Sequence, residues 1–484
     1  MLLVLLSLAA FLRLFRIESL MRFIWDEGRD MIAIREIIVH RNLTLFGPFN
    51  EAAGKMDFFG VFHYYLMLPA LWIAHFNPVG PAIFTALLGV AAVGLTYVWC
   101  KQWLSKSQAL IITGFMALSP LVVQFNRWPW NPNTTGFFGI LFLLSLQRWN
   151  KRPTYFMAAV GGILLGLLFQ LHYFTISLGA AALVTWYWQN VLFLKQKVTH
   201  AVIFTLAVIL PNLTFVLFDL THEGFYRNIL FKSFNYSSSS QQLFEVNPVQ
   251  MLLGFPTYIL DVSTKFMGNQ LLGYFLTLIF TVWLLRSLHA FWQTKTVTES
   301  FQLSIAWIIF LIITAFFPSL RDEYHSACLW IAFPVALVEL VSPWAQKQSK
   351  SALAVVVVVS GLFLIYANHL FRPPSNYENM PRVRAASLAA AQDAQNKSEV
   401  NVASFVDANT RATRFRYFLI NENIKLLDVD SYPQTKVLYV ISPNNWEETR
   451  KNPAWELDTF RSLPAEQLWH DGSWWVYRVE KPTM

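Results

Sequence analysis

The first thirty residues, MLLVLLSLAAFLRLFRIESLMRFIWDEGRD, join an apolar run at 1–17 to a charged cluster, WDEGRD, at 25–30. An apolar run of about 17–25 residues spans a bilayer as a helix, because each backbone polar group is then satisfied within the segment. The run at 1–17 has neither a basic start nor a small-residue cleavage site, so we interpret it as an anchor rather than a cleaved signal. The charged cluster is therefore expected at the membrane surface.

Further apolar runs predict a polytopic α-helical membrane protein with about 11 transmembrane helices. The run at 58–76 is also apolar, but counting it as a span would reverse the side of every later loop. We therefore interpret it as a re-entrant or surface helix. The predicted spans are 1–17, 79–99, 108–125, 133–147, 154–172, 174–192, 199–218, 268–285, 300–317, 326–343 and 352–370.

Alternate loops between these spans are short and basic, which is typical of the cytoplasmic side of a membrane protein. They contain a single acidic residue, Glu299. This pattern predicts a plasma-membrane protein with a cytoplasmic N-terminus, and an odd number of spans places the C-terminus outside. The net charge of +8 then reflects topology and gives little support to a nucleic-acid partner. The basic residues are Lys101, Lys106, Arg148, Lys151, Arg152, Lys195, Lys197, Arg286, Lys295, Lys347 and Lys350.

The charged fraction divides the chain into two parts. It is 14% overall, well below the roughly 25% of soluble domains, but it reaches 24% in 373–484 and only about 10% before that segment. We expect a transmembrane domain at 1–370, with a large first outer loop at 18–78, and an extracytoplasmic soluble α/β domain at 371–484. The only two cysteines, Cys100 and Cys328, fall on opposite predicted faces, which excludes a disulfide framework.

The C-terminal segment carries strand and helix patterns of its own. Short runs rich in β-branched and aromatic residues predict strands, and an alanine-rich stretch with an early proline predicts a helix. The predicted helix is 378–396, and the predicted strands are 400–406, 436–442 and 473–479.

Asp26 and Glu27 are the first candidates for chemistry. Side chains of adjacent helical residues point about 100° apart, so we expect the two carboxylates to have different roles. Asp26 has two interpretations: it caps the helix that follows, by accepting free backbone N–H groups, or it acts as a general base at the membrane surface. The two roles are compatible, because a cap position also fixes the carboxylate.

Other polar residues of the predicted outer loops are candidates for binding a substrate or a lipid phosphate. In the first loop, Lys55 either meets a lipid phosphate or extends to the headgroups. Arg127, Asn131 and Asn133 lie at the start of a predicted helix, where guanidinium and amide groups can bind hydroxyls and phosphate oxygens. His172, at the outer end of a predicted span, either faces a cavity or bonds to a neighbouring helix. The cluster of Arg321, Glu323 and His325 is either a phosphate site or a solvated loop. The candidates are Lys55, His63, Tyr64, Arg127, Asn131, Asn133, His172, Arg321, Glu323 and His325.

Nucleotide-binding patterns are absent from the sequence. It contains neither a P-loop nor a G-x-G-x-x-G motif, and the predicted inner loops are too short for a nucleotide-binding domain. The polar candidates gather on the outer side, where nucleotide sugars are not available. An enzyme at this surface needs a donor that is already activated and embedded in the membrane, and a phosphate-linked lipid meets both requirements.

At this point the chain resembles the GT-C superfamily of membrane glycosyltransferases, in the branch of protein O-mannosyltransferases and the aminoarabinose transferase ArnT. The resemblance covers about 1–370. It rests on a first span ending in FLRLFRI, on Asp26 and Glu27 in a long outer loop, and on the segments GVFHYYLMLP at 60–69 and YHSACLWIAFP at 324–334. It also includes an asparagine-rich outer loop after the third span.

The resemblance implies sugar transfer from a polyprenyl-phosphate-linked donor to an acceptor hydroxyl on the outer face of the bilayer, with inversion. Asp26 matches the family's catalytic carboxylate, and Lys55 corresponds to a basic residue near the lipid phosphate. Where many members have a second acid in the second outer loop, this chain has Asn131 and Asn133. A divalent metal therefore stays an open question, and no nucleotide cofactor is expected. The acceptor is a protein, a lipid or a glycan.

A single displacement needs one base, whereas retention needs a second, nucleophilic carboxylate. We expect Asp26 to accept the proton of the acceptor hydroxyl, and Arg127, Arg321 or Lys55 to neutralise the departing phosphate. Two alternatives are a polytopic transporter and a non-catalytic envelope assembly factor. A transporter typically carries charges near the bilayer midplane and pseudo-symmetric halves, which this sequence lacks.

Overall fold

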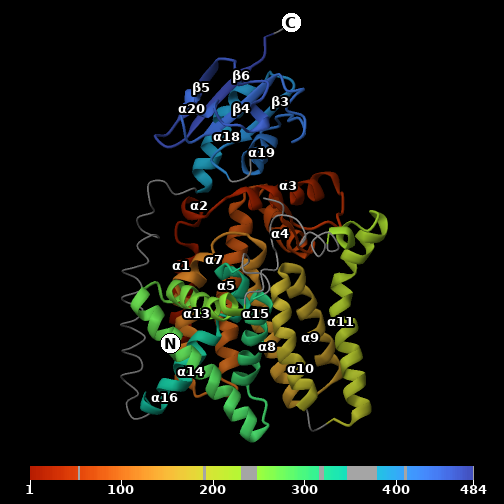
Figure 1. Ribbon diagram of the computed structural model, residues 1–484, viewed down its shortest axis with the longest axis vertical. Helices are drawn as coiled ribbons and strands as arrows, with labels where there is room; N and C mark the ends of the chain where they lie inside the picture. The colour runs from red at the N-terminus through yellow and green to blue at the C-terminus, as the bar shows by residue number, and fades with distance from the viewer. Residues whose placement is uncertain are drawn as a thin grey trace.

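A bundle of helices carries a small α/β unit at one end (Figure 1). The computed structural model describes residues 1–52, 55–188, 192–229, 248–315, 321–345, 379–407 and 411–482. The bundle is formed by the apolar helices between α1 and α16, and the α/β unit is formed by the residues from 379 onward. The helices α2 (Ile17–Leu20) and α3 (Trp25–His40) lie between the two parts, so the start of α3 is at their junction.

Each predicted span within the described residues coincides with a helix or with two consecutive helices; the span predicted at 352–370 lies outside them. Residue patterns explain several boundaries: Ser105 caps the helix after it, and Ser119 ends that helix and caps the next, which begins at Pro120. The helices of the bundle are α1 Leu2–Leu14, α5 Val79–Cys100, α6 Lys106–Leu118, α7 Pro120–Phe125, η1 Asn131–Thr134, α8 Thr135–Lys151, α9 Tyr155–Leu171, η2 Tyr173–Ser177, α10 Leu178–Trp188, α11 Leu194–Thr221, α13 Pro248–Met267, α14 Gln270–Thr294, α15 Glu299–Ala315, η5 Glu323–Leu329 and α16 Ala332–Ala345.

Three helices among the described residues, α5, α11 and α14, are long and apolar enough to cross a membrane by themselves. The pair η5 and α16 meets the same criterion together, but it is bent by 59°, as in a broken span or a re-entrant segment. Four shorter apolar helices, α1, α6, α9 and α15, accompany them. The helical membrane character is therefore confirmed, whereas the number of eleven spans stays a prediction.

The segment 18–78, which the sequence predicts to be the first outer loop, folds over one end of the bundle. It contains α2 (Ile17–Leu20), α3 (Trp25–His40), the antiparallel hairpin β1 (Phe49–Ala52) and β2 (Lys55–Phe58), and α4 (Phe62–Ile73). The twelve residues of α4 span only about 18 Å at the helical rise, too short for a bilayer core of about 30 Å. This length agrees with a surface helix in the run 58–76. The hairpin was not predicted.

A four-stranded sheet in the order β3-β4-β6-β5 forms the C-terminal unit. β4 pairs in parallel with β3 and antiparallel with β6, and all six of its residues are buried. The predicted helix and the three predicted strands are confirmed. The elements are α18 Met380–Ala394, β3 Val400–Ser404, α19 Thr413–Asn421, β4 Val437–Ser442, α20 Trp446–Thr449, η7 Trp455–Leu457, β5 Ala465–His470 and β6 Trp475–Glu480.

The sheet buries different residues on its two faces, as the period of two in a strand requires. Leu438 and Val440 pack against the side of α20, in a core that belongs to the C-terminal unit alone. Val437 and Tyr439 pack on the other face, beside α18 and α19. That second core continues without interruption into α3 and α4, where it includes Met31. The C-terminal unit therefore shares its main core with the first outer loop.

Candidate active site at the start of α3

Glu27 fixes the first turn of α3. Its Oε2 accepts a hydrogen bond of 2.8 Å from the backbone N–H of Ile24, which is the residue before the helix. Asp26 is the second residue of the helix and makes no such bond, so the prediction that Asp26 caps α3 is wrong. Glu27 takes the capping role because it occupies the third helical position, from which a carboxylate reaches back to the cap. The two adjacent carboxylates have separate roles, as expected.

Asp26, Arg29 and Asp30 form one charged cluster on one face of α3, because residues three and four positions apart share a face. Arg29 Nη1 lies 2.8 Å from Asp26 Oδ1, and Arg29 Nη2 lies 2.8 Å from Asp30 Oδ1. The guanidinium also donates to the carbonyl of Phe49 in the hairpin. Asp30 is fully buried, whereas the Asp26 side chain keeps 10% of its surface accessible. Of the three carboxylates in this turn, only that of Asp26 keeps accessible surface.

His63 and Tyr64 of α4 face this cluster and are both buried. His63 Nε2 lies 3.5 Å from Asp30 Oδ2, which is longer than a normal hydrogen bond. Burial, together with the nearby Arg29, lowers the pKa of His63 to about 3. The imidazole is therefore neutral near pH 7, and its contact with Asp30 is not an ion pair. These two predicted residues belong to the candidate active site, as a wall behind the carboxylates.

Burial controls the ionisation of the carboxylates. It raises the pKa of Asp26, although Arg29 acts in the opposite direction. Burial and the neighbouring Asp26 raise the pKa of Glu27 to about 8. A raised carboxyl pKa is typical of groups that accept or donate protons in catalysis, but buried structural groups show it as well. Solvent access distinguishes the two cases here, because Glu27 is fully buried and Asp26 is not.

The pKa of Glu27 predicts how stability depends on pH. Because the folded protein binds the Glu27 proton more tightly than the unfolded chain does, the stabilisation is complete below about pH 4.5 and is lost as pH rises through about 8. Glu27→Gln keeps an acceptor for the Ile24 N–H and cannot ionise. We expect the melting temperature of wild type to fall relative to that of Glu27→Gln between pH 5 and pH 9. Parallel curves in that window would contradict the assignment.

A second cluster contains His172 and His325, whose ring centroids lie 4.9 Å apart. His172 follows α9 and His325 lies in η5, so two distant segments meet here. The Nδ1 of His172 accepts from the N–H of Phe174, which leaves Nε2 as the protonated nitrogen. This nitrogen is buried and has no partner within the protein. An unused buried donor is a candidate for contact with a ligand oxygen.

The segment between β2 and α4 links the two clusters. The ring of Phe59 lies 5.2 Å from that of His172, and Gly60 donates its N–H to the carbonyl of Gln170. Four residues after Phe59, His63 faces Asp30. The carboxylate cluster and the histidine pair therefore both contact the short segment 59–63.

The other residues of the second outer loop have structural contacts. Arg127 donates to the carbonyls of Leu12 and Phe15 at the C-terminal end of α1. The side-chain amide of Asn131 donates to the carbonyl of Leu171, and that of Asn133 donates to the carbonyl of Trp128. Arg127 thereby satisfies helix-end carbonyls, and these contacts favour a structural role over phosphate binding for it.

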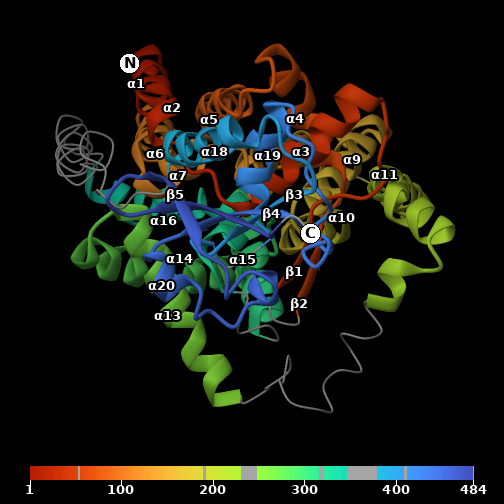
Figure 2. The same cartoon turned by 90° about the horizontal axis from the view of Figure 1, so that it is seen from above.

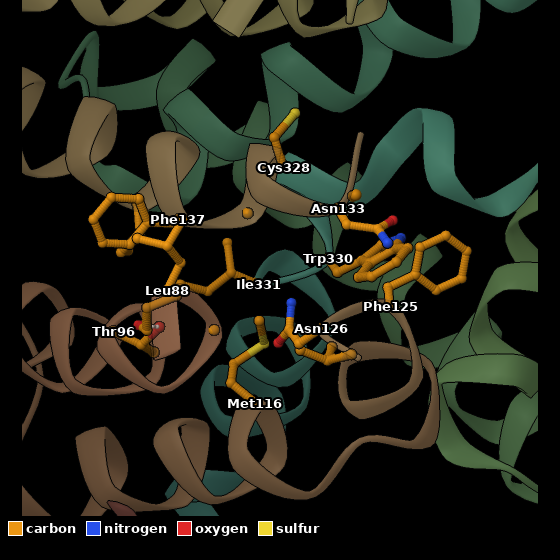
Figure 3. Close-up of a pocket in the computed structure, with 16 residues that line it drawn as sticks. Leu88, Thr96, Met116, Phe125, Asn126, Asn133, Phe137, Cys328, Trp330 and Ile331 are labelled. Atoms are coloured by element: carbon orange, nitrogen blue, oxygen red, sulfur yellow. Dashed lines mark hydrogen bonds between the residues drawn. The ribbon is translucent and has the colours of Figure 1, made fainter. Parts of the chain in front are cut away.

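Asn133 and Asn126 also line a small, mostly apolar cavity of about 40 Å³, beside Phe125, Cys328 and Trp330 (Figure 3). The Oδ1 atom of Asn133 is buried without a partner in the protein. A cavity of this size holds ordered water rather than a sugar. Asn133 therefore lines a cavity between helices of the bundle.

Of the remaining predicted residues, Arg321 and Glu323 lie beside α13, and Lys55 lies in β2. Glu323 accepts from Lys265 Nζ at 2.9 Å, and Arg321 donates to the carbonyl of Thr314. The Arg321 guanidinium packs closely against Gly254, where an added Cβ would lie 1.7 Å from Nη1. Lys55 begins β2, and its side chain lies outside the described part of the chain. None of these three residues is brought to the Asp26 cluster by a described contact.

Within the part of the chain that the structure describes, no three side chains of His, Cys, Asp or Glu form a group that could hold a metal ion. Asp26 and Asp30 do lie near each other, but the guanidinium of Arg29 occupies the position between them. The positive charge at this site is therefore supplied by the protein. The described residues of this cluster do not fit a bound metal.

Arg29 and Asp30 are part of the site; the sequence placed them in the charged cluster of the first loop but gave neither a role. Their spacing contained the signal: residues 26, 29 and 30 are separated by three and four positions and so share one helix face. The sequence does not reveal that Asp30 is buried and Asp26 accessible, because that difference depends on α4 packing over the helix.

Comparisons with known proteins establish the fold. No protein-family model matches the sequence, and no curated protein matches it. Solved structures match it at 13% identity: ArnT from Cupriavidus metallidurans in the apo state has a TM-score of 0.62, over 98% of this chain and 97% of ArnT. ArnT bound to undecaprenyl phosphate gives 0.60 over the same shares. The Archaeoglobus fulgidus oligosaccharyltransferase AglB, with an inhibitory peptide and a dolichol-phosphate, gives 0.52, over 91% of this chain and 68% of AglB.

These likenesses show the fold: a helical bundle that carries a C-terminal α/β unit, arranged as in ArnT. The resemblance predicted from the sequence is thus confirmed for the fold, and it extends over the C-terminal unit as well.

Proposed function

We propose that this chain is a glycosyltransferase that moves a sugar from a polyprenyl-phosphate-linked donor to an acceptor hydroxyl, with inversion. The observation that carries the proposal is the accessible, Arg29-paired carboxylate of Asp26 beside two fully buried carboxylates. The fold supports it, because ArnT is found bound to undecaprenyl phosphate and AglB with a dolichol-phosphate. The transporter and the assembly factor offer no role for this arrangement.

In this proposal Asp26 accepts the proton from the acceptor hydroxyl as its oxygen attacks the anomeric carbon, and the lipid phosphate leaves. One carboxylate is sufficient for inversion. Arg29 holds Asp26 in place through Oδ1, and Asp30 holds Arg29. His63 is neutral and packs behind the pair, so it contributes shape rather than charge. Glu27 has no direct part in proton transfer, because its carboxylate caps α3.

The leaving phosphate needs hydrogen-bond donors near Asp26. We assign His172 Nε2 to this role, with His325 beside it, because both are buried with an unpartnered nitrogen. Lys55 is a further candidate, since β2 ends next to the segment that joins the two clusters. Arg127 and Arg321 are less favourable, because their guanidinium groups already bind backbone carbonyls.

The proposal includes the topology. The carboxylate cluster and the C-terminal unit at 371–484 are placed on the outer face of the plasma membrane, with the N-terminus in the cytoplasm. This placement rests on the basic residues of the alternate loops. The acceptor is a protein, lipid or glycan hydroxyl, and the bilayer supplies the donor.

Donor consumption is the direct test. Purified protein is reconstituted with polyprenyl-phosphate mannose, glucose or aminoarabinose, and membranes from cells lacking the chain supply the acceptor. We expect one donor to be converted to free polyprenyl phosphate, with the sugar recovered in the acceptor fraction by mass spectrometry. An inverted anomeric configuration would support the single displacement. No conversion of any of the three donors would contradict the proposal.

His172→Phe tests the assigned phosphate contact. The substitution keeps an aromatic ring against Phe59 but removes the Nε2–H donor. One hydrogen bond is worth about 0.5–1.5 kcal/mol, so we expect the KM for the lipid donor to rise about two- to thirteenfold. His222→Phe, at an exposed histidine after α11, is the matched control. An unchanged KM in His172→Phe would remove this residue from the site.

A further inference from the structure

The backbone that leads into α3 is held along one side by the C-terminal unit. The N–H of Met380 donates to the carbonyl of Met21 at 3.2 Å. Arg414 Nη1 donates to the carbonyl of Phe23 at 3.3 Å, and Thr413 Oγ1 donates to the carbonyl of Trp25 at 2.6 Å. Three successive alternate carbonyls before Asp26 are thus bound by residues more than 350 positions away.

The first turn of α3 is in direct backbone contact with the first turn of α19. A Cβ atom added at Gly28 would lie 2.3 Å from the backbone nitrogen of Arg414. Only a glycine permits this approach, two residues after Asp26. Both views of the molecule place α19 against α3 (Figures 1 and 2).

Arg414 is itself rigidly held. Its Nη2 lies 2.6 Å from Asp407 Oδ1, and neither side chain is exposed. Asp407 also accepts from Ser404 at the end of β3. The chain of contacts therefore runs from the sheet of the C-terminal unit, through Asp407 and Arg414, to the backbone next to Asp26.

We propose that Thr413 and Arg414 of the C-terminal unit are positioning residues that set the orientation of the Asp26 carboxylate. This inference rests on the proposed function. A base must lie within hydrogen-bonding reach of the proton that it accepts, and a displacement of about 1 Å can cost a factor of roughly 100 in rate. Met21 and Phe23 precede α3 and Trp25 is its first residue, so the C-terminal unit holds the chain where α3 begins. The C-terminal unit thereby becomes part of the active site without touching the substrate.

Thr413→Val tests the proposal, because valine has nearly the shape of threonine and lacks the hydroxyl. We expect kcat to fall about tenfold with the KM for the polyprenyl-phosphate sugar unchanged, and Thr413→Ser to restore kcat. Tyr417→Phe is the matched control: it removes a hydroxyl that donates to the carbonyl of Phe76, elsewhere on the same interface. Both variants lose one interface hydrogen bond, so we expect similar melting temperatures. Equal kcat values in Thr413→Val and Tyr417→Phe would overturn the proposal.

A second measurement separates this inference from the proposed function. Amide hydrogen exchange of peptides covering residues 21–30 needs no substrate. We expect faster exchange there in Thr413→Val than in wild type and Tyr417→Phe. Unchanged exchange would overturn the positioning role even if the wild type transfers sugar. If exchange is faster in Thr413→Val but the wild-type protein transfers no sugar, only the proposed function is contradicted.

Discussion

Asp26→Asn is expected to reduce sugar transfer by roughly 10²–10⁴-fold, the usual contribution of a general base. The amide keeps an oxygen for Arg29 Nη1, and Arg29 keeps its contact with Asp30. The variant should therefore insert and fold like wild type while lacking a group that accepts the acceptor's proton. The measurement is the conversion of polyprenyl-phosphate sugar by purified protein, with Glu18→Gln, the same change at an exposed residue of α2, as the control.

The pH dependence gives an independent check on Asp26. A base acts only when ionised, so activity should rise with pH as Asp26 loses its proton. Because burial raises the pKa of Asp26, the acid limb of kcat/KM should lie above the ordinary aspartate value of about 3.9. Full activity of Asp26→Asn, or an acid limb at or below that value, would remove Asp26 from the role of base.

Sequence patterns predicted the helical elements of the fold well, because an apolar run leaves few structural choices. Each predicted span that falls in the described residues coincides with helix, from α1 to α16. The strands β3, β4 and β6 were also predicted, since each carries a dense run of buried residues. β5 was not predicted: its sequence, AEQLWH, lies at the edge of the sheet and is mostly exposed, so it lacks an apolar pattern.

Elements stabilised mainly by tertiary contacts were missed. α13, at Pro248–Met267, was assigned to an outer loop, because Asp261 and Lys265 interrupt its apolar run; in the structure these two residues pair on the helix surface. α19 was missed for a related reason. Its sequence, TRFRYFLIN, mixes arginines with aromatics, and both Arg414 and Arg416 are buried through partners that only the fold brings near.

In the candidate site, too, the sequence identified residues, and only the fold shows their contacts. Asp26 was identified from its position after the first span, whereas its distinction from Glu27 required the cap geometry of α3. His172 and His325 were both candidates, but only the fold shows that their rings meet. Arg127 resembled a phosphate ligand because its type fits that role. The sequence could not show that two carbonyls of the first span already occupy its guanidinium.

Arg29→Met should be the most destabilising single change in the carboxylate cluster. It removes the shared partner of Asp26 and Asp30, and it leaves the fully buried Asp30 without a counter-charge. Breaking a buried ion pair by removing one partner costs about 3–5 kcal/mol. Because Arg29 lowers the pKa of Asp26, its loss should raise that pKa further and shift the acid limb of activity to higher pH. The measurements are the melting temperature of the purified protein and the pH profile of kcat/KM.

The direction in which a second substitution changes the melting temperature distinguishes this charge argument from a simple loss of packing. In the wild-type background, Asp30→Asn should lower the melting temperature, because Arg29 loses one of its two carboxylates. In the Arg29→Met background the same substitution should raise it, because the remaining buried charge is then unpaired and its removal relieves a desolvation penalty. A double-mutant cycle measures this reversal directly. If Asp30→Asn lowers the melting temperature in both backgrounds, Arg29 acts through packing, and the electrostatic account of how Asp26 is held must be abandoned.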